Sequence, residues 1–303
     1  MKIPVITIIT PSFNQGRFIE ETIKSIIFQE GDFFLEYMVM DGGSTDNTVE
    51  ILNRYDWLIK DGRLPVYCRG LKYTWCSEKD RGQTDAINKG LKASSGEFVG
   101  WLNSDDTYLP GAIRKAIEYF NEHDDVAMLY GEGYHIRENG EVIARYYTEP
   151  FDRNRLAQLC YICQPTVFLR KKAVEAAGPL DIALNYCMDY EYWIRIANNH
   201  NIGYINDYLA NSRLYAETKT MSKRVEIHEE ILDVCKRHYG GVHDSWLHGY
   251  ADAYLRRWIE PESSRFESFI FYKFRALLFC IKSIQVNGRF PRVVLTYLCK
   301  YKF

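Results

Sequence analysis

Two adjacent carboxylates, Asp105 and Asp106, follow the apolar run at residues 98–102 after Asn103 and Ser104. Hard divalent cations prefer oxygen ligands, and a cation at such a pair can hold a diphosphate while offsetting the repulsion between the two acids. The same residues can instead be turn residues that cap the helix predicted to follow from Pro110. The pair alone therefore leaves a metal site and a helix cap as alternatives.

A second polar loop, DGGSTD at residues 41–46, follows the apolar run 35–40. Its paired glycines allow close approach of the backbone to a ligand. Ser44, Thr45 and Asp46 can equally cap the next helix. Asp41 is not needed for a cap, and at the end of a strand it can accept hydrogen bonds from a base or a ribose.

Other polar positions carry weaker signals. The run at residues 78–83 precedes a helix and is also explained as a solvated charged turn. Cys160 and Cys163 form a close pair without a second pair at zinc-finger spacing, so we expect them to pack as small apolar groups. No H-E-x-x-H is present, and His228 and His243 are only candidates for a further metal ligand.

The loops share one position relative to the predicted strands. Apolar strand-like runs at 5–10, 35–40, 73–76 and 98–102 alternate with helical spacing after residue 19, after residue 48, at 84–93 and from Pro110. This alternation predicts a largely parallel sheet with helices on its faces, in which polar loops at the carboxyl ends of strands form the ligand site.

The second half of the chain changes rhythm. The Asn139–Gly140 pair predicts a hairpin over residues 134–147. Helices are predicted at 152–159, from Lys171 to a stop at Gly178, at 188–198 and at 224–239, and strands at 165–169 and 202–205.

Composition excludes several classes of protein. The 303 residues are 47% hydrophobic and 26% charged, which is typical of a globular chain with a full-sized core. A net charge of -2 gives no global basic field for nucleic acid. Neither a P-loop nor a G-x-G-x-x-G after the first strand is present, which argues against ATPase and dinucleotide-binding functions. We expect no signal peptide, no transmembrane span, and reduced thiols in a cytosolic protein.

The last forty or so residues differ from the rest. From residue 263 onward eight basic residues stand against one acid, Glu267, so this segment carries +7 and the remainder -9. It is also rich in Phe, Tyr and Leu. Such a segment can hold a protein at an anionic membrane surface, or it can form helices packed on the catalytic domain or at a dimer interface.

The order of the motifs is specific: TPSFN at 10–14, DGGSTDNT at 41–48, DRG at 80–82, NSDD at 103–106 and MDYEYW at 188–193. Together they resemble the family 2 glycosyltransferases over about residues 3–225. The resemblance implies the α/β GT-A fold, a mostly parallel sheet flanked by helices. It implies a catalytic domain at 1–225, with a nucleotide-binding half at about 1–110 and an acceptor half at about 111–225, followed by a helical basic and aromatic extension at 226–303.

Matched residue by residue, the resemblance implies roles for the motif positions. Asp106 matches the acid of the DxD element that coordinates Mn²⁺ or Mg²⁺ on the donor diphosphate, and Asp105 lies near the ribose. The implied nucleotide-binding residues are Thr10, Pro11, Phe13, Asn14, Asp41, Asp80, Arg81 and Asp105.

Asp189 matches the catalytic base of the family. Met188 stands where the family commonly has an acid, so Glu191 remains the alternative base, and a helix N-cap remains the structural alternative for Asp189. Residues 189 and 191 do not face the same way on a helix, so only one can serve. The resemblance also implies acceptor or diphosphate contacts for Gln164, Trp101, Glu191, Trp193, Arg213 and Lys219.

The implied activity is inverting, metal-dependent transfer of a sugar from a nucleotide-diphosphate donor, with a UDP-sugar as first choice. The acceptor is a hydroxyl of a glycan or lipid-linked molecule in surface polysaccharide or glycan assembly. We expect a cytoplasmic enzyme, peripheral at the inner face of the plasma membrane if its tail binds there. The alternatives are a nucleotidyltransferase, for which residues 10–16 offer little of the required Gly-rich basic loop, and a non-catalytic nucleotide- or sugar-binding module.

Overall fold

The computed structural model describes residues 3–291 and divides them into two compact units. The first unit comprises residues up to 151 together with 161–215, and the second comprises 152–160 together with residues from 216 onward. The sequence places a domain boundary near residue 225. That boundary stays a prediction, and each unit is described here by itself.

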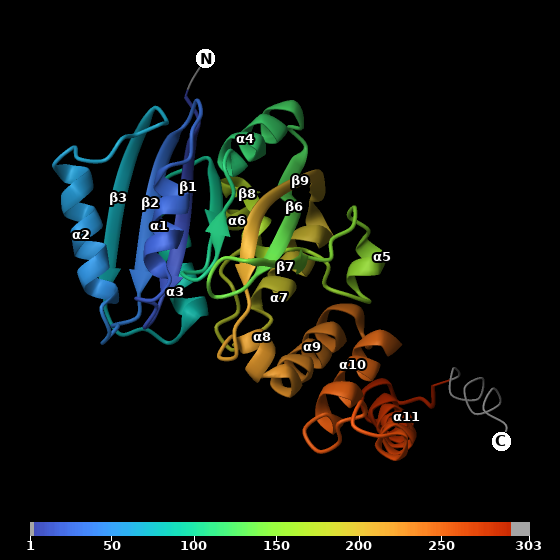
Figure 1. Ribbon diagram of the computed structural model, residues 1–303. Helices are drawn as coiled ribbons and strands as arrows, with labels where there is room; N and C mark the ends of the chain where they lie inside the picture. The colour runs from blue at the N-terminus through green and yellow to red at the C-terminus, as the bar shows by residue number, and fades with distance from the viewer. Residues whose placement is uncertain (1–2, 292–303) are drawn as a thin grey trace. The chain divides into compact units, whose positions relative to one another are not determined.

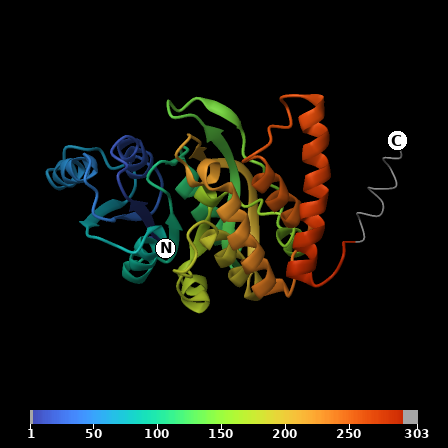
Figure 2. The same cartoon turned by 90° about the horizontal axis from the view of Figure 1, so that it is seen from below.

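The first unit begins with the predicted alternation of strands and helices (Figure 1). The strands β1, β2, β3 and β4 pair in parallel, and the crossovers between them run through α1, α2 and α3. Figure 2 shows α1 and α2 on one face of these strands and α3 on the other. The bounds are β1 Val5–Ser12, α1 Ile19–Ile27, β2 Phe34–Asp41, α2 Thr48–Lys60, β3 Gly70–Ser77, α3 Gln83–Ala93 and β4 Phe98–Trp101.

The sheet continues beyond β4 with mixed pairing: β8 is antiparallel to β4 and to β6, whereas β6 and β9 are parallel. Within the described residues it has nine strands in the order β3-β2-β1-β4-β8-β6-β9-β5, and β7 pairs with β6 off this path. The second-half strands are β5 Thr107–Tyr108, β6 Val126–Ile136, β7 Val142–Arg145, β8 Phe168–Arg170 and β9 Asn201–Arg213. The predicted hairpin is therefore present as β6 and β7, joined by a turn in which Gly140 has a φ of 84°.

Helices and one 3-10 turn connect these strands. They are α4 Ala112–Glu122, η1 Gln164–Thr166, α6 Lys171–Ala177 and α7 Met188–Asn199, with α5 Arg153–Leu156 belonging to the second unit. On α4 the residues at helical spacing, Ile113, Ala116, Ile117 and Phe120, are buried, and the Phe120 ring stacks on Phe98 of β4 at 4.9 Å between centroids.

Several predicted boundaries are wrong. The helix predicted from Pro110 begins at Ala112, because Gly111 takes a left-handed conformation with a φ of 77° just before it. Pro165 lies in η1 rather than in a strand. The helix predicted at 152–159 is the short α5, with Asp152 as its N-cap. The strand predicted at 202–205 is only the start of β9, which continues to Arg213.

The second unit is helical. Its helices are α8 Lys219–Ser222, α9 Arg224–Tyr239, α10 Asp244–Leu255 and α11 Arg265–Asn287, with α10 packed against both α9 and α11. No helix between residues 3 and 291 combines the length and the apolarity needed to cross a membrane. The predicted basic tail continues to residues 292–303, which lie outside the described residues.

Candidate active site

The predicted ligand loops meet at one edge of the sheet. β1 lies between β2 and β4, and the chain proceeds from β1 to β2 on one side but reaches β4 by crossing back from β3. This reversal of strand order is a topological switch point, where open α/β sheets bind ligands outside the carboxyl ends of their strands. Ser12 ends β1, Asp41 ends β2, and the NSDD motif begins two residues after β4.

Asp106 is the deepest acid at this edge. Its side chain is 4% exposed, Oδ1 accepts a hydrogen bond from the Arg213 backbone N–H at 2.9 Å, and Oδ2 accepts one from Asn103 Nδ2 at 3.2 Å. Burial raises the pKa of Asp106 well above its ordinary value, and the neighbouring charge of Asp105 raises it further. A positive charge beside Asp106 would therefore stabilise its ionised form.

Asp105 is partly exposed and contacts a residue that sequence reasoning missed. Tyr215 donates its hydroxyl hydrogen to Asp105 Oδ2 at 2.9 Å and accepts a hydrogen bond from Gln15 Nε2 at 3.4 Å. The Tyr215 ring lies 5.0 Å from that of Phe18. Burial, and secondly the charge of Asp105, raises the pKa of Tyr215, which keeps the hydroxyl protonated as a donor.

Arg213 contacts the loop that carries Asp105 and Asp106. Its side chain is buried, and it donates hydrogen bonds to the backbone carbonyls of Asp105 at 2.8 Å and Glu138 at 2.5 Å. It also pairs with Glu21 at 2.5 Å. These partners make Arg213 a positioning residue for Asp105 in this structure, whereas its predicted contact with a diphosphate stays a prediction.

A chain of side-chain amides crosses the site. Gln83 Nε2 donates to Asn103 Oδ1 at 2.7 Å, and Asn103 Nδ2 donates to Gln164 Oε1 at 3.0 Å. Gln164 Nε2 then donates to the carbonyl of Trp101 at 3.0 Å. The chain links the start of α3, the NSDD motif and η1, so the position of Asp106 depends on residues far apart in the sequence.

Asp41 is buried and organises the loop that follows it. Its carboxylate accepts hydrogen bonds from the N–H groups of Gly43 at 3.1 Å and Ser44 at 2.9 Å, and from the hydroxyls of Ser44 at 2.5 Å and Ser77 at 2.6 Å. Its predicted contact with a nucleoside stays a prediction. Next to it, Ser12 Oγ is buried and has no hydrogen-bond partner among the described residues, which leaves a polar atom for a ligand hydroxyl.

The loop after β1 is fastened to the loop after β2. Asn14 takes a left-handed conformation with a φ of 52°, its N–H donates to Ser44 Oγ at 2.7 Å, and its Oδ1 accepts from the Thr45 N–H at 2.8 Å. The adjacent Phe13 side chain is 59% exposed, so its ring is available for stacking. Thr10 is buried within β1 and its Oγ1 accepts a hydrogen bond from Tyr37 at 3.2 Å, and Pro11 also lies within β1.

The DRG turn contacts the same loop. A Cβ on Gly42 would lie 2.8 Å from Asp80 Oδ2, so a glycine is required for this close approach. Asp80 Oδ1 accepts a hydrogen bond from the Gly82 N–H at 2.8 Å. The exposed Arg81 pairs with Asp85 at 3.0 Å.

On α7 the two candidate bases have different surroundings. Glu191 is buried and pairs with Arg195 at 2.9 Å one turn later, so it has a structural partner. Asp189 is partly exposed in the first turn, and its Oδ1 accepts a hydrogen bond from the Tyr190 N–H at 2.7 Å. It does not occupy the N-cap position, which is Cys187.

The face of α7 that carries Asp189 is directed towards β4. Trp193 lies one turn after Asp189 on the same face and stacks on Trp101 at 5.0 Å between ring centroids. Both indoles are buried, as core residues are, and the predicted acceptor contacts of Trp101, Glu191 and Trp193 stay predictions. Lys219 begins α8 in the second unit.

The donor set at the switch point suits a hard divalent cation. Asp105 and Asp106 offer carboxylate oxygens, and the raised pKa of Asp106 indicates that a cation there would relieve an unfavourable charge. Between residues 3 and 291 no group of three or more His, Cys, Asp or Glu side chains is arranged to hold a metal. Protein ligands alone do not complete a coordination shell at this pair.

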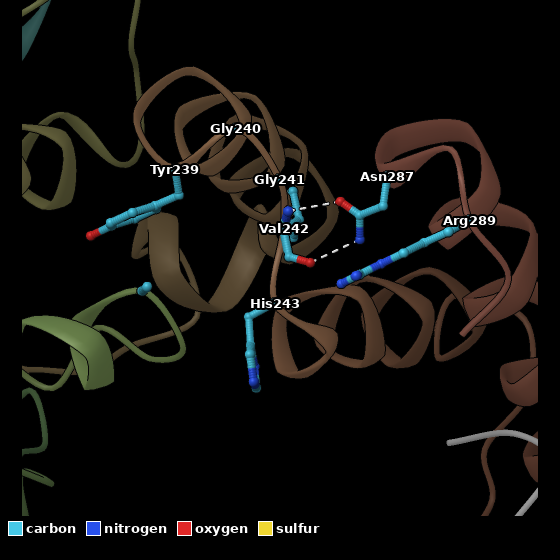
Figure 3. Close-up of a pocket in the computed structure, with 8 residues that line it drawn as sticks. Tyr239, Gly240, Gly241, Val242, His243, Asn287 and Arg289 are labelled. Atoms are coloured by element: carbon cyan, nitrogen blue, oxygen red, sulfur yellow. Dashed lines mark hydrogen bonds between the residues drawn. The ribbon is translucent and has the colours of Figure 1, made fainter. Parts of the chain in front are cut away.

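A pocket of about 410 Å³ lies in the second unit (Figure 3). Asn287 bridges the backbone N–H and carbonyl of Val242 at 2.8 Å and 2.9 Å beside it. No predicted nucleotide-binding or catalytic residue lines this pocket. Of the two candidate histidine ligands, His243 lines it and has its Nδ1 2.8 Å from Ser245 Oγ, whereas His228 Nδ1 lies 2.7 Å from the carbonyl of Arg224.

The sequence is similar to those of known proteins. The profile of glycosyl transferase family 2 matches residues 7–178, more than half of the chain. The chain is 24% identical over 217 residues to an uncharacterized glycosyltransferase of Methanocaldococcus jannaschii, which covers 70% of this chain and 71% of that protein.

Two solved structures have a similar fold. S. aureus TarS 1-349 in complex with UDP-GlcNAc has a TM-score of 0.59 and 19% identity over 87% of this chain and 74% of that chain. The mannosyltransferase PcManGT from Pyrobaculum calidifontis, in complex with GDP-Man and Mn²⁺, has a TM-score of 0.60 and 15% identity over 91% of this chain and 81% of that chain. The predicted GT-A architecture is confirmed.

Proposed function

The chain belongs to glycosyl transferase family 2, and we propose that it moves a sugar from a nucleoside-diphosphate donor to a hydroxyl of a glycan or lipid-linked acceptor, with inversion at the anomeric carbon. The observation that carries the proposal is the meeting of the Asp41 loop, the DRG turn and the Asp105–Asp106 pair at the switch point. We propose glycan or surface polysaccharide assembly as the setting.

A nucleoside diphosphate suits this edge for chemical reasons. Ser12 Oγ and the acids at the strand ends offer acceptors for ribose hydroxyls, and the exposed Phe13 ring offers a stacking surface for a base. We propose UDP as the nucleotide because the S. aureus TarS structure holds UDP-GlcNAc. The Pyrobaculum structure holds GDP-Man, so GDP is the next nucleotide to test.

We propose that Asp105 and Asp106 hold Mn²⁺ or Mg²⁺ together with the donor diphosphate, whose oxygens complete the coordination shell that the protein leaves incomplete. A cation bound there supplies positive charge against the charge that develops on the leaving diphosphate. Tyr215 and Arg213 fix the two acids in place through the contacts of the loop. The Pyrobaculum structure with Mn²⁺ supports the choice of cation.

Asp189 is the group that we propose as general base. It lies at the start of α7, one turn before Trp193, whose ring stacks on Trp101 of β4. As the acceptor oxygen attacks the anomeric carbon from the side opposite the diphosphate, Asp189 takes the hydroxyl proton and the C–O bond to the diphosphate breaks. Glu191 is the weaker candidate because Arg195 already engages its carboxylate.

Asp189→Asn tests this assignment. We expect kcat to fall by roughly 10²–10⁴-fold, the range typical of a lost general base, with the affinity for the nucleoside diphosphate unchanged. Glu175→Gln, an exposed acid on α6, is the matched control and leaves kcat unchanged. Wild-type turnover in the Asp189→Asn variant would remove Asp189 from the mechanism, and loss of kcat only in Glu191→Gln would transfer the role to Glu191.

Product analysis tests the stereochemistry. A single displacement inverts the anomeric configuration, so an α-linked donor gives a β-linked product, which NMR of the product reads directly. Retention of the donor configuration would contradict single displacement with one base.

A further inference from the structure

Helix α11 has one covered face and one exposed apolar face. Its covered face packs on α10: the Phe279 ring stacks on His248 at 3.9 Å, Arg275 pairs with Asp252 at 3.6 Å, and Lys282 Nζ lies 4.3 Å from the Tyr250 ring centroid. Figure 2 shows α11 as a long straight helix. All of these partners belong to the second unit.

The other side of α11 is apolar along its whole length. At 100° per residue, six large side chains fall within one stripe about 80° wide. Five of them are between 42% and 72% exposed, and Ile270 is half-buried. This α11 apolar face consists of Phe266, Ile270, Phe274, Leu277, Ile281 and Ile284.

Positive charge borders the α11 apolar face. Lys273 lies about 20° outside one edge of the stripe, Arg265 begins the helix and Arg289 follows its end. The single acid of α11, Glu267, accepts a hydrogen bond from Ser263 Oγ at 2.5 Å. A surface that covers this face must therefore be apolar inside and negative at its boundary.

A second copy of the chain does not meet this requirement. A two-fold contact through the α11 apolar face would bring the same patch of each copy together and place two Lys273 residues near each other. The helix carries four basic residues against the single acid Glu267, so two copies would bring a net positive charge together. Charge complementarity favours an anionic partner over self-association.

We propose that α11 lies flat on an anionic lipid bilayer, with its apolar face in the boundary between headgroups and acyl chains and its cations among the lipid phosphates. The face runs from Phe266 to Ile284, so at 1.5 Å per residue it extends about 27 Å along the membrane surface. The proposal goes beyond sugar transfer, since a bilayer is the only ligand involved, and it succeeds or fails independently of the reaction.

Co-sedimentation of the full chain with lipid vesicles tests the proposal. We expect at least about tenfold stronger partitioning onto vesicles of phosphatidylglycerol and phosphatidylcholine in equal parts than onto phosphatidylcholine alone. The double variant Leu277→Gln/Ile281→Gln removes two apolar side chains from the face and lowers partitioning by about tenfold or more. The matched control, Val142→Gln/Ile143→Gln, replaces two exposed apolar residues of β7 in the first unit and binds as wild type does.

The Lys273→Glu variant tests how much positive charge contributes to vesicle binding while the apolar face is left intact. It is expected to reduce binding to the anionic vesicles while thermal melting of the variant matches that of wild type, since Lys273 is exposed. Absence of wild-type binding to anionic vesicles, equal binding by the α11 double variant, or a wild-type dimer in light scattering that the double variant converts to a monomer would each overturn the proposal.

Discussion

At the scale of single residues, the acids of the site differ in their hydrogen bonding. Asp41 accepts four hydrogen bonds from its own loop and from Ser77, whereas Asp106 accepts two and has its pKa raised by burial and by Asp105. The first arrangement stabilises a loop, whereas the second leaves on Asp106 a charge that is unfavourable without a cation beside it.

Asp41→Asn is expected to destabilise the protein. The amide replaces one acceptor oxygen with a donor group that faces other donors, and hydrogen bonds to a charged acceptor contribute roughly 1.5–3 kcal/mol each. We expect the free energy of unfolding to fall by about 2 kcal/mol in urea denaturation. Asp32→Asn is the control, because Asp32 forms an exposed ion pair with Arg69 that contributes little. Equal stability of both variants would show that the loop does not depend on the Asp41 carboxylate.

At the scale of elements, a buried glutamate joins three strands. Glu36 of β2 accepts hydrogen bonds from Thr7 of β1 at 2.7 Å and from the Ser95 N–H before β4 at 2.8 Å, and it pairs with Lys72 of β3 at 2.8 Å. Burial raises the pKa of Glu36, but these hydrogen bonds more than offset it, so the pKa lies below its ordinary value of 4.5.

Because the pKa of Glu36 is lowered in the folded state, the free energy of unfolding depends on pH in the acid range. A carboxyl with a depressed folded-state pKa contributes its full stability above its unfolded pKa and loses it as the pH falls through the folded value. Glu36→Gln is therefore expected to lower the free energy of unfolding by about 2 kcal/mol at neutral pH and to make the loss of stability below pH 4.5 shallower. Denaturation of both proteins across the acid range measures this, with the exposed Glu97→Gln as control. Parallel acid profiles for wild type and Glu36→Gln would contradict the assignment.

The elements of the first half were predictable because their signals are local. Apolar runs marked β1, β2 and β4, and helical spacing marked α1 and α3. The errors arose where distant partners decide the local structure. β9 continues to Arg213 because its backbone pairs with β6 and β5, and the polar residues along it gave no alternating pattern in the sequence.

The same reasoning explains which site residues were missed. Short motifs predicted roles for Asp105, Asp106 and Asp189, and these roles stay predictions. Tyr215 was missed because it lies 110 residues from Asp105 and its contact leaves no local pattern. Gln164 was among the predicted residues, but its hydrogen bond with Asn103, 61 residues away, leaves no local pattern either. Ser12 ends β1 within a motif that was found, but only the structure reveals that its hydroxyl is buried without a partner among the described residues.

At the scale of the whole molecule, net positive and net negative charge are carried by different parts of the chain. The segment from residue 263 carries +7 and the remainder -9. The acidic part contains the switch-point site, and the basic part contains α11 with its apolar face. This separation matches an enzyme that binds a cation with a diphosphate through one unit and a negatively charged surface through the other.

The central claim is that the switch point binds a nucleoside diphosphate together with a divalent cation. Calorimetric titration with UDP, GDP, CDP and dTDP, each with and without Mn²⁺, tests it on wild type, on Asp106→Asn and on the control Asp32→Asn. We predict that one diphosphate, UDP by our proposal, binds wild type and the control in the presence of Mn²⁺ and binds Asp106→Asn at least about tenfold more weakly. Failure of all four diphosphates to bind wild type with Mn²⁺, or equal binding by Asp106→Asn, would contradict the claim.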